Sequence, residues 1–120
     1  MNKILLDAAD LLRDGKEGPR WIQHNYHGRD KYGRDTYCAI AAIRKIAGTS
    51  LSPYTNVNRP PEYKEAVHTL ARLVVGPNIT EKHAETFVID WNDERGRTAR
   101  QVIRAMYKAA GVPWYKRLFK

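Results

Sequence analysis

The 120-residue chain has a single cysteine, Cys38, and this scarcity limits how the fold is stabilised. One cysteine cannot form a disulfide within the chain, and a lone thiol is typical of a reducing compartment. The sequence also has no apolar run long enough to cross a bilayer. Its first residues, MNKILLDAADLL, lack the basic stretch and the small-residue cleavage site of a signal peptide. We therefore expect a cytoplasmic protein.

Motifs for metal ions and for sequence-specific nucleic-acid recognition are missing as well. His24, His27 and Cys38 would offer a metal ion three ligands, whereas a structural zinc site typically needs four. No helix-turn-helix, zinc-finger or RNA-binding signature is present. We expect no metal and no other cofactor.

Helical periodicity dominates the sequence and predicts a mainly α protein. Apolar residues recur at helical spacing in about five segments, which form a small single-domain bundle over residues 1–111. Trp21, Ile22 and Tyr26 beside two GRD units predict a short β-hairpin over residues 21–36. The helices are expected over residues 3–14, 37–47, 60–75, 81–91 and 99–110. Pro60 and Pro61 start the third helix, and the others are capped in turn by Asn2, Asp35 or Thr36, Thr80 and Thr98. A basic aromatic tail follows over residues 112–120.

The stretch WNDERGRT joins the last two predicted helices. We expect Trp91 to close the core beside Ala84, Phe87 and Val88, and Gly96 to permit the turn. Asn92 and Asp93 suit a helix exit, because short polar side chains bond local backbone. Thr98 can cap the final helix.

Together with Val102, the Trp21 segment and the Cys38-Ala39 helix start, WNDERGRT resembles a small domain family of unknown function from actinobacteria and their phages. The similarity covers roughly residues 3–110, and Ala41 stands where the family usually has glycine. The resemblance implies this architecture and a bacterial or phage setting, without an activity or established site residues.

Positive charge gathers at the C-terminal end of the chain. Residues 94–120 carry eight Lys and Arg side chains against one acid, Glu94, in a chain of formal net charge +8. On a helical wheel the cations of the last helix share one narrow face, opposite Val102, Ile103 and Met106. The predicted contact surface comprises Arg97, Arg100, Arg104, Tyr107, Lys108, Trp114, Tyr115, Lys116 and Arg117.

Such a surface attracts an acidic protein or a nucleic-acid phosphate backbone, although a solvated face of a basic protein gives the same pattern. We expect a non-enzymatic interaction protein with a host protein as partner, in preference to nonspecific nucleic-acid binding. The tail WYKRLFK is too short for firm membrane anchoring, so membrane association is not expected.

Cys38 provides an enzymatic alternative. A thiol at a helix N-terminus can have a lowered pKa, and His24 or His27 could act as its base, with Asn92 or Asp93 orienting the imidazole. This would make the protein a Cys-dependent hydrolase or transferase. A buried small residue in an alanine-rich helix is the interpretation we favour.

Overall fold

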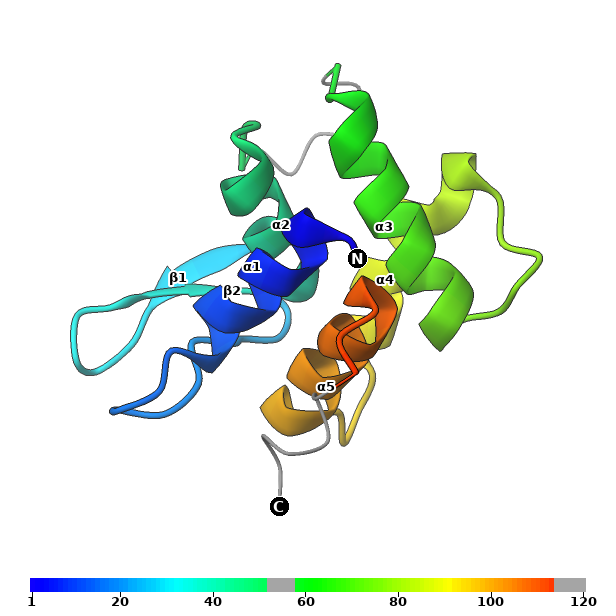
Figure 1. Ribbon diagram of the computed structural model, residues 1–120. Helices are drawn as coiled ribbons and strands as arrows, with labels where there is room; N and C mark the ends of the chain where they lie inside the picture. Colours follow the sequence, from blue (N-terminus) through cyan, green and yellow to red (C-terminus); the bar gives the residue numbers. More distant parts are fainter. Residues whose placement is uncertain (52–57, 114–120) are drawn as a thin grey trace.

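The computed structural model describes residues 1–51 and 58–113, which form five α-helices and a two-stranded antiparallel sheet (Figure 1). The strands β1 (His27–Arg29) and β2 (Asp35–Tyr37) form a hairpin between the first two helices. The helices are α1 (Lys3–Arg13), α2 (Ala39–Ala47), α3 (Pro61–Val74), α4 (Glu81–Asp93) and α5 (Ala99–Ala110). The mainly α fold with a small hairpin is thus confirmed. None of the helices in these residues is long and apolar enough to cross a bilayer.

Most helix ends lie where the capping residues predict them. The Asn2 side chain accepts a hydrogen bond from the Leu5 N–H, and α2 and α5 end at Gly48 and Gly111 in the left-handed conformation. Thr98 forms a capping box with Gln101, in which each side chain bonds the other residue's backbone N–H. These local contacts set the direction in which α5 leaves the turn.

The start of α2 corrects the sequence prediction. Cys38, not Asp35 or Thr36, is the N-cap, and its thiol accepts a hydrogen bond from the Ala41 N–H. Tyr37 stays in β2, where it pairs with His27 of β1, while its N–H donates to the Arg20 carbonyl and its carbonyl accepts from the Ile22 N–H. The hairpin therefore begins at residue 27 and ends at residue 37, whereas the sequence predicted it over residues 21–36.

The core lies between the helices, with α2 at its centre. Residues 39–44 are all fully buried, since the alanines of α2 let neighbouring helices approach closely. Figure 1 shows α1 beside α5 and α3 beside α4. Ala84 and Val88 face the core as expected, but Phe87 is 42% exposed and does not belong to the buried stripe.

Asn92 joins three distant segments through its fully buried side chain. Its Oδ1 accepts hydrogen bonds from Trp21 Nε1 at 2.6 Å and from the Ala39 N–H at 3.0 Å. Its Nδ2 donates to the Ile22 carbonyl at 3.2 Å and to Asp93 Oδ1 at 3.0 Å. The amide therefore bonds distant segments, and not the local backbone that the sequence suggested.

Asp93 extends the same junction. Its Oδ1 also accepts a hydrogen bond from the His24 N–H at 2.9 Å. His24 has a φ of 67°, a left-handed conformation that is costly for a residue with a Cβ, and the carboxylate helps to hold it there. The segment from Trp21 to His24 is thus fixed against the end of α4.

Replacing Asn92 by alanine should lower the free energy of unfolding by about 2–4 kcal/mol, because Trp21 Nε1 and the Ala39 N–H would lose their buried acceptor. Urea unfolding followed by circular dichroism measures the change. The matched control is Asn78→Ala, at an exposed turn residue, with an expected cost below about 0.5 kcal/mol. Equal losses in the two variants would contradict a structural role for the Asn92 amide.

Candidate functional site

Some of the predicted cations line a depression beside α5. Arg97, Arg104 and Lys108 line an open depression of about 410 Å³ between α3 and α5, here called the α3–α5 groove. Arg100 is exposed but does not line the groove. The other lining residues are Leu73, Val74, Trp91, Gln101 and Ala105. The structure therefore brings together three of the predicted cations, one before α5 and two on it, beside apolar side chains.

Arg97 is held in place by the preceding turn. Its Nε donates to the Trp91 carbonyl at 3.0 Å, and its Nη2 is 2.5 Å from Glu94 Oε2. The guanidinium carbon lies 4.9 Å from the centroid of the Trp91 ring, within reach of a cation–π interaction. Glu94 is thus the acid that pairs with this arginine. Arg97 thus forms a rigid end of the groove with its charge partly neutralised.

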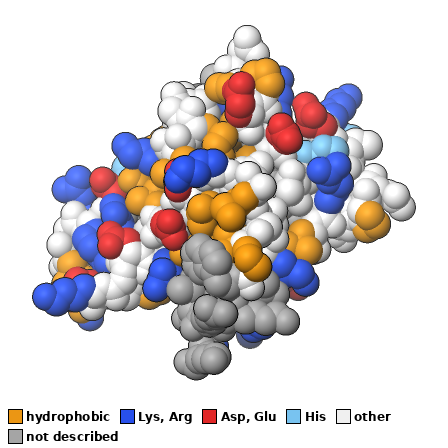
Figure 2. All heavy atoms as spheres, in the orientation of Figure 1, with side chains coloured by type: hydrophobic (Ala, Val, Ile, Leu, Met, Phe, Trp, Pro, Cys, Tyr) orange, Lys and Arg blue, Asp and Glu red, His pale blue; other side chains and the backbone are white. Residues whose placement is uncertain are grey.

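The floor of the groove is apolar and partly accessible. Leu73 is 40% exposed, and Val74, Trp91 and Ala105 are partly buried against the core. Arg104 and Lys108 are exposed beside them on α5. Figure 2 shows hydrophobic and basic side chains next to one another where α3 and α5 meet. An apolar strip flanked by cations can take a ligand that has both an apolar side and negative charge.

Tyr107 does not belong to this surface, which corrects the sequence prediction. Its side chain is fully buried, and its hydroxyl donates a hydrogen bond to Asp10 Oδ1 of α1. The wheel placed Tyr107 next to the cations, but α1 packs against that side of α5 and covers it. Burial, together with the bond to Asp10, raises the pKa of Tyr107 to about 12.

This raised pKa predicts a stability loss at alkaline pH. The unfolded tyrosine releases its proton near pH 10, while the folded one keeps it up to about 12. Stability from Tyr107 is therefore complete below pH 10 and falls as the pH rises to 12. Tyr107→Phe should lose less stability over this interval, by on the order of 2 kcal/mol, in urea unfolding at a series of pH values. Parallel curves of unfolding free energy against pH for the wild type and Tyr107→Phe would contradict a raised pKa of Tyr107.

The tail residues of the predicted surface, Trp114, Tyr115, Lys116 and Arg117, lie outside the described residues. Residues 1–51 and 58–113 contain no group of three His, Cys, Asp or Glu side chains placed to hold a metal ion.

The Cys38 thiol does not form the pair that a Cys-His enzyme needs. It is buried at the α2 N-terminus, and burial raises its pKa instead of favouring the thiolate. The His27 ring contacts Asp35 at 3.2 Å and stacks on Tyr37, while His24 bonds Asp93 through its backbone. Asn92 and Asp93 hold the fold and do not orient a histidine ring in the described residues. This arrangement agrees with the interpretation of Cys38 as a small core residue.

Burial also predicts slow labelling of Cys38. A disulfide reagent such as dithionitrobenzoate should react with the folded protein at least about a hundredfold more slowly than with the urea-unfolded chain, because the thiol is inaccessible and its pKa is raised. The released thiolate is measured by absorbance. Faster labelling of the folded form would instead support an activated thiol.

A buried polar network that sequence reasoning missed links α2, α3 and α4. Arg44 is fully buried and donates from Nη2 to Glu85 Oε1 at 2.7 Å and from Nε to the Tyr63 hydroxyl at 3.1 Å. Tyr63 in turn donates to Glu85 Oε2 at 2.6 Å. Burial and the bond to Glu85 raise the pKa of Tyr63, so the phenol stays protonated. The available signal was Arg44 directly after the apolar run 39–43 of α2.

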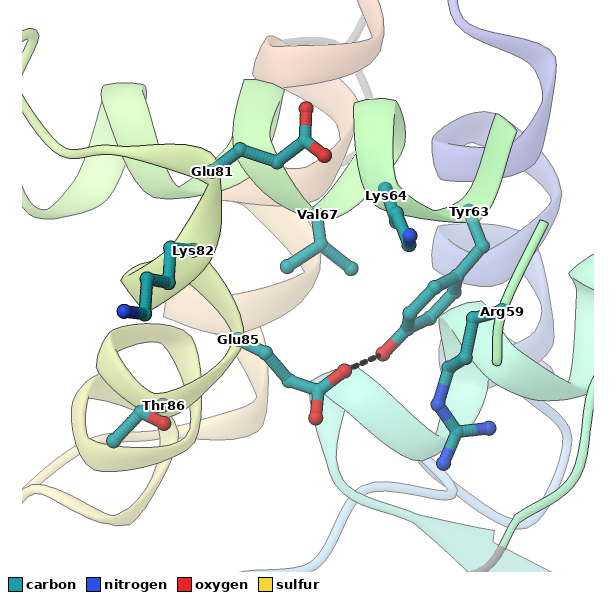
Figure 3. Close-up of a pocket in the computed structure, with 8 residues that line it drawn as sticks. All are labelled: Arg59, Tyr63, Lys64, Val67, Glu81, Lys82, Glu85 and Thr86. Carbon is teal, nitrogen blue, oxygen red and sulfur yellow. Dashed lines mark hydrogen bonds between the residues drawn. The ribbon is translucent and has the colours of Figure 1, made fainter. Parts of the chain in front are cut away.

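This network borders a second hollow, here called the α3–α4 cavity, of about 300 Å³ (Figure 3). Tyr63, Lys64 and Val67 of α3 line one side. The remaining lining residues are Arg59, just before α3, and Glu81, Lys82, Glu85 and Thr86 of α4. Unlike the α3–α5 groove, this cavity has charged groups of both signs.

The fold and its surface define a small helical protein with a cationic, partly apolar groove and a separate polar cavity. The chain belongs to a family of unknown function, DUF6197, whose model matches residues 1–112. No curated protein and no solved structure matches the chain. Membership of a family of unknown function is thereby confirmed, while the actinobacterial or phage setting stays a prediction.

Proposed function

We propose that the protein is a non-enzymatic phage or bacterial accessory protein that binds an acidic segment of a host protein in the α3–α5 groove. The observation that carries the proposal is the apolar floor of Leu73, Val74 and Trp91 in the same groove as cations of α5. Binding would take place in the cytoplasm of the bacterial host.

The apolar floor favours a protein partner over nucleic acid. A phosphate backbone would use Arg104 and Lys108 but would gain nothing from contact with Leu73. An amphipathic acidic segment uses both, since its apolar side chains cover Leu73 and Val74 while its carboxylates meet the cations. Charge then steers the encounter, and the apolar contact slows dissociation.

Charge reversal tests the cationic side. We expect Arg104→Glu with Lys108→Glu to weaken binding of a synthetic acidic amphipathic helix peptide at least about tenfold, a change of about 1.4 kcal/mol. Fluorescence anisotropy of the labelled peptide measures the affinity. The matched control, Lys16→Glu with Lys45→Glu, changes the net charge equally at exposed lysines outside the groove. Equal weakening in both double variants would leave only a general charge effect and contradict the groove.

Leu73→Ser separates the two kinds of partner. It should weaken the peptide severalfold and leave a DNA duplex of about 20 base pairs unaffected, because only the peptide contacts the apolar floor. If the duplex binds more tightly than the peptide and loses affinity steeply with salt, nonspecific nucleic-acid binding replaces the proposal.

A further inference from the structure

The α3–α4 cavity has no part in the proposed function, yet it has the properties of a ligand site. Its volume of about 300 Å³ is at the lower end of the range for small-molecule pockets. It is lined by the N-terminal halves of two helices, which hold their side chains on rigid backbone. A small molecule would therefore meet a surface that is already shaped.

One wall of the cavity is fixed by the buried network. Both carboxylate oxygens of Glu85 are held, Oε1 by Arg44 at 2.7 Å and Oε2 by the Tyr63 hydroxyl at 2.6 Å. Figure 3 shows the Glu85 carboxylate turned toward Tyr63, with the tyrosine ring forming the wall beside it. Since these groups are ordered before any ligand arrives, binding does not have to supply that ordering.

The charge around the cavity is positive. Three lining side chains are cationic, Arg59, Lys64 and Lys82, against the two acids Glu81 and Glu85. The charge of Glu85 is matched by Arg44, which lies behind the wall and is fully buried. An excess of positive charge therefore faces the cavity, and it favours an anionic ligand.

Two cations and an apolar wall define where such a ligand would lie. Arg59 is 5% exposed, and its Nη1 donates to the Ser50 carbonyl at 2.6 Å, which fixes the guanidinium at one end. Lys64 extends from α3 into the space between Val67 and Tyr63, whereas Lys82 points away from Tyr63 (Figure 3). Val67 and Tyr63, each 2% exposed, supply a small apolar contact. Lys64 and Arg59 are thus the cations nearest that contact.

We propose that the α3–α4 cavity binds a small organic anion whose carboxylate or phosphate group lies between Lys64 and Arg59. The apolar part of the ligand packs against Val67 and the ring of Tyr63. Carboxylates and phosphate monoesters share this chemistry, and both bind lysine and arginine through charge-assisted hydrogen bonds. The site is separate from the α3–α5 groove and does not depend on the function proposed for it.

Titration of the whole protein with three probes tests the site: phenyl phosphate, benzoate and the uncharged benzyl alcohol. Amide shifts in nitrogen-15 correlation spectra are recorded at low salt. We expect saturable shifts for at least one anion, largest at Tyr63, Lys64 and Glu85, and weaker binding of benzyl alcohol. Phenyl phosphate binding alone would indicate a phosphate ligand, and benzoate binding alone a carboxylate. No saturable binding of either anion up to roughly 20 mM, enough to fill a millimolar site, would overturn the proposal.

Two variants assign the binding to the cavity. Lys64→Met should weaken the anion at least about fivefold, by removing the exposed cation at the apolar wall. Thr86→Trp should also weaken it, by filling space from the exposed side of α4. Lys45→Met, an exposed lysine outside the cavity, is the matched control. Equal affinity in the Lys64→Met and Lys45→Met proteins would show nonspecific anion binding and overturn the proposal.

Anion binding in the α3–α4 cavity can be tested separately from peptide binding in the α3–α5 groove. Arg104→Glu with Lys108→Glu should leave anion binding in the cavity within about twofold of wild type, because these residues do not line it. Lys64→Met should likewise leave peptide binding in the groove unchanged. Loss of both anion binding and peptide binding in either variant would show that the cavity and the groove are not independent.

Discussion

The buried carboxamide of Asn92 is the contact on which the arrangement of the other segments depends. It accepts from the indole of Trp21 and the N–H of Ala39, and it donates to the carbonyl of Ile22. The bond to Ala39 is buried and the other two are partly buried, so the amide must be in position when the Trp21 segment, α2 and α4 close together. A side chain with only acceptors, or with none, cannot satisfy all of them. The position therefore demands an amide.

The orientation of α5, and with it the groove, follows from the same junction. Asn92 fixes the end of α4, and the next residues return along it, with Arg97 bonded to the Trp91 carbonyl and stacked on its ring. The capping box at Thr98 then starts α5. Trp91 thus serves the fold through its carbonyl and the groove through its ring. A motif that is read from the sequence as a helix joint also builds one end of the candidate binding surface.

The features that the sequence predicted are those that depend on near neighbours. Asn2, Gly48 and Thr98 act on backbone within a few residues, so the helix ends follow from local chemistry. Apart from Asp93, the partners of Asn92 lie 53 to 71 residues away, and Arg44 reaches Glu85 across 41 residues. Periodicity carries no information over such separations. Tyr107 shows the same limit, because a helical wheel gives an angle on α5 but cannot show that α1 covers it. The cation pattern was visible in the sequence, whereas the apolar floor beside it, to which α3 contributes Leu73 and Val74, was not.

Stability alone does not account for the Arg44–Tyr63–Glu85 network. Removing a guanidinium and a carboxylate from water costs several kcal/mol per group, and the attraction between them largely offsets that cost without exceeding it. Well-packed apolar side chains at these three positions would hold α2, α3 and α4 together at least as firmly. What the polar groups add is a carboxylate fixed by bonds to both oxygens, with Tyr63 kept protonated beside it. Their consequence for the molecule is thus a rigid polar wall, and that wall faces the α3–α4 cavity.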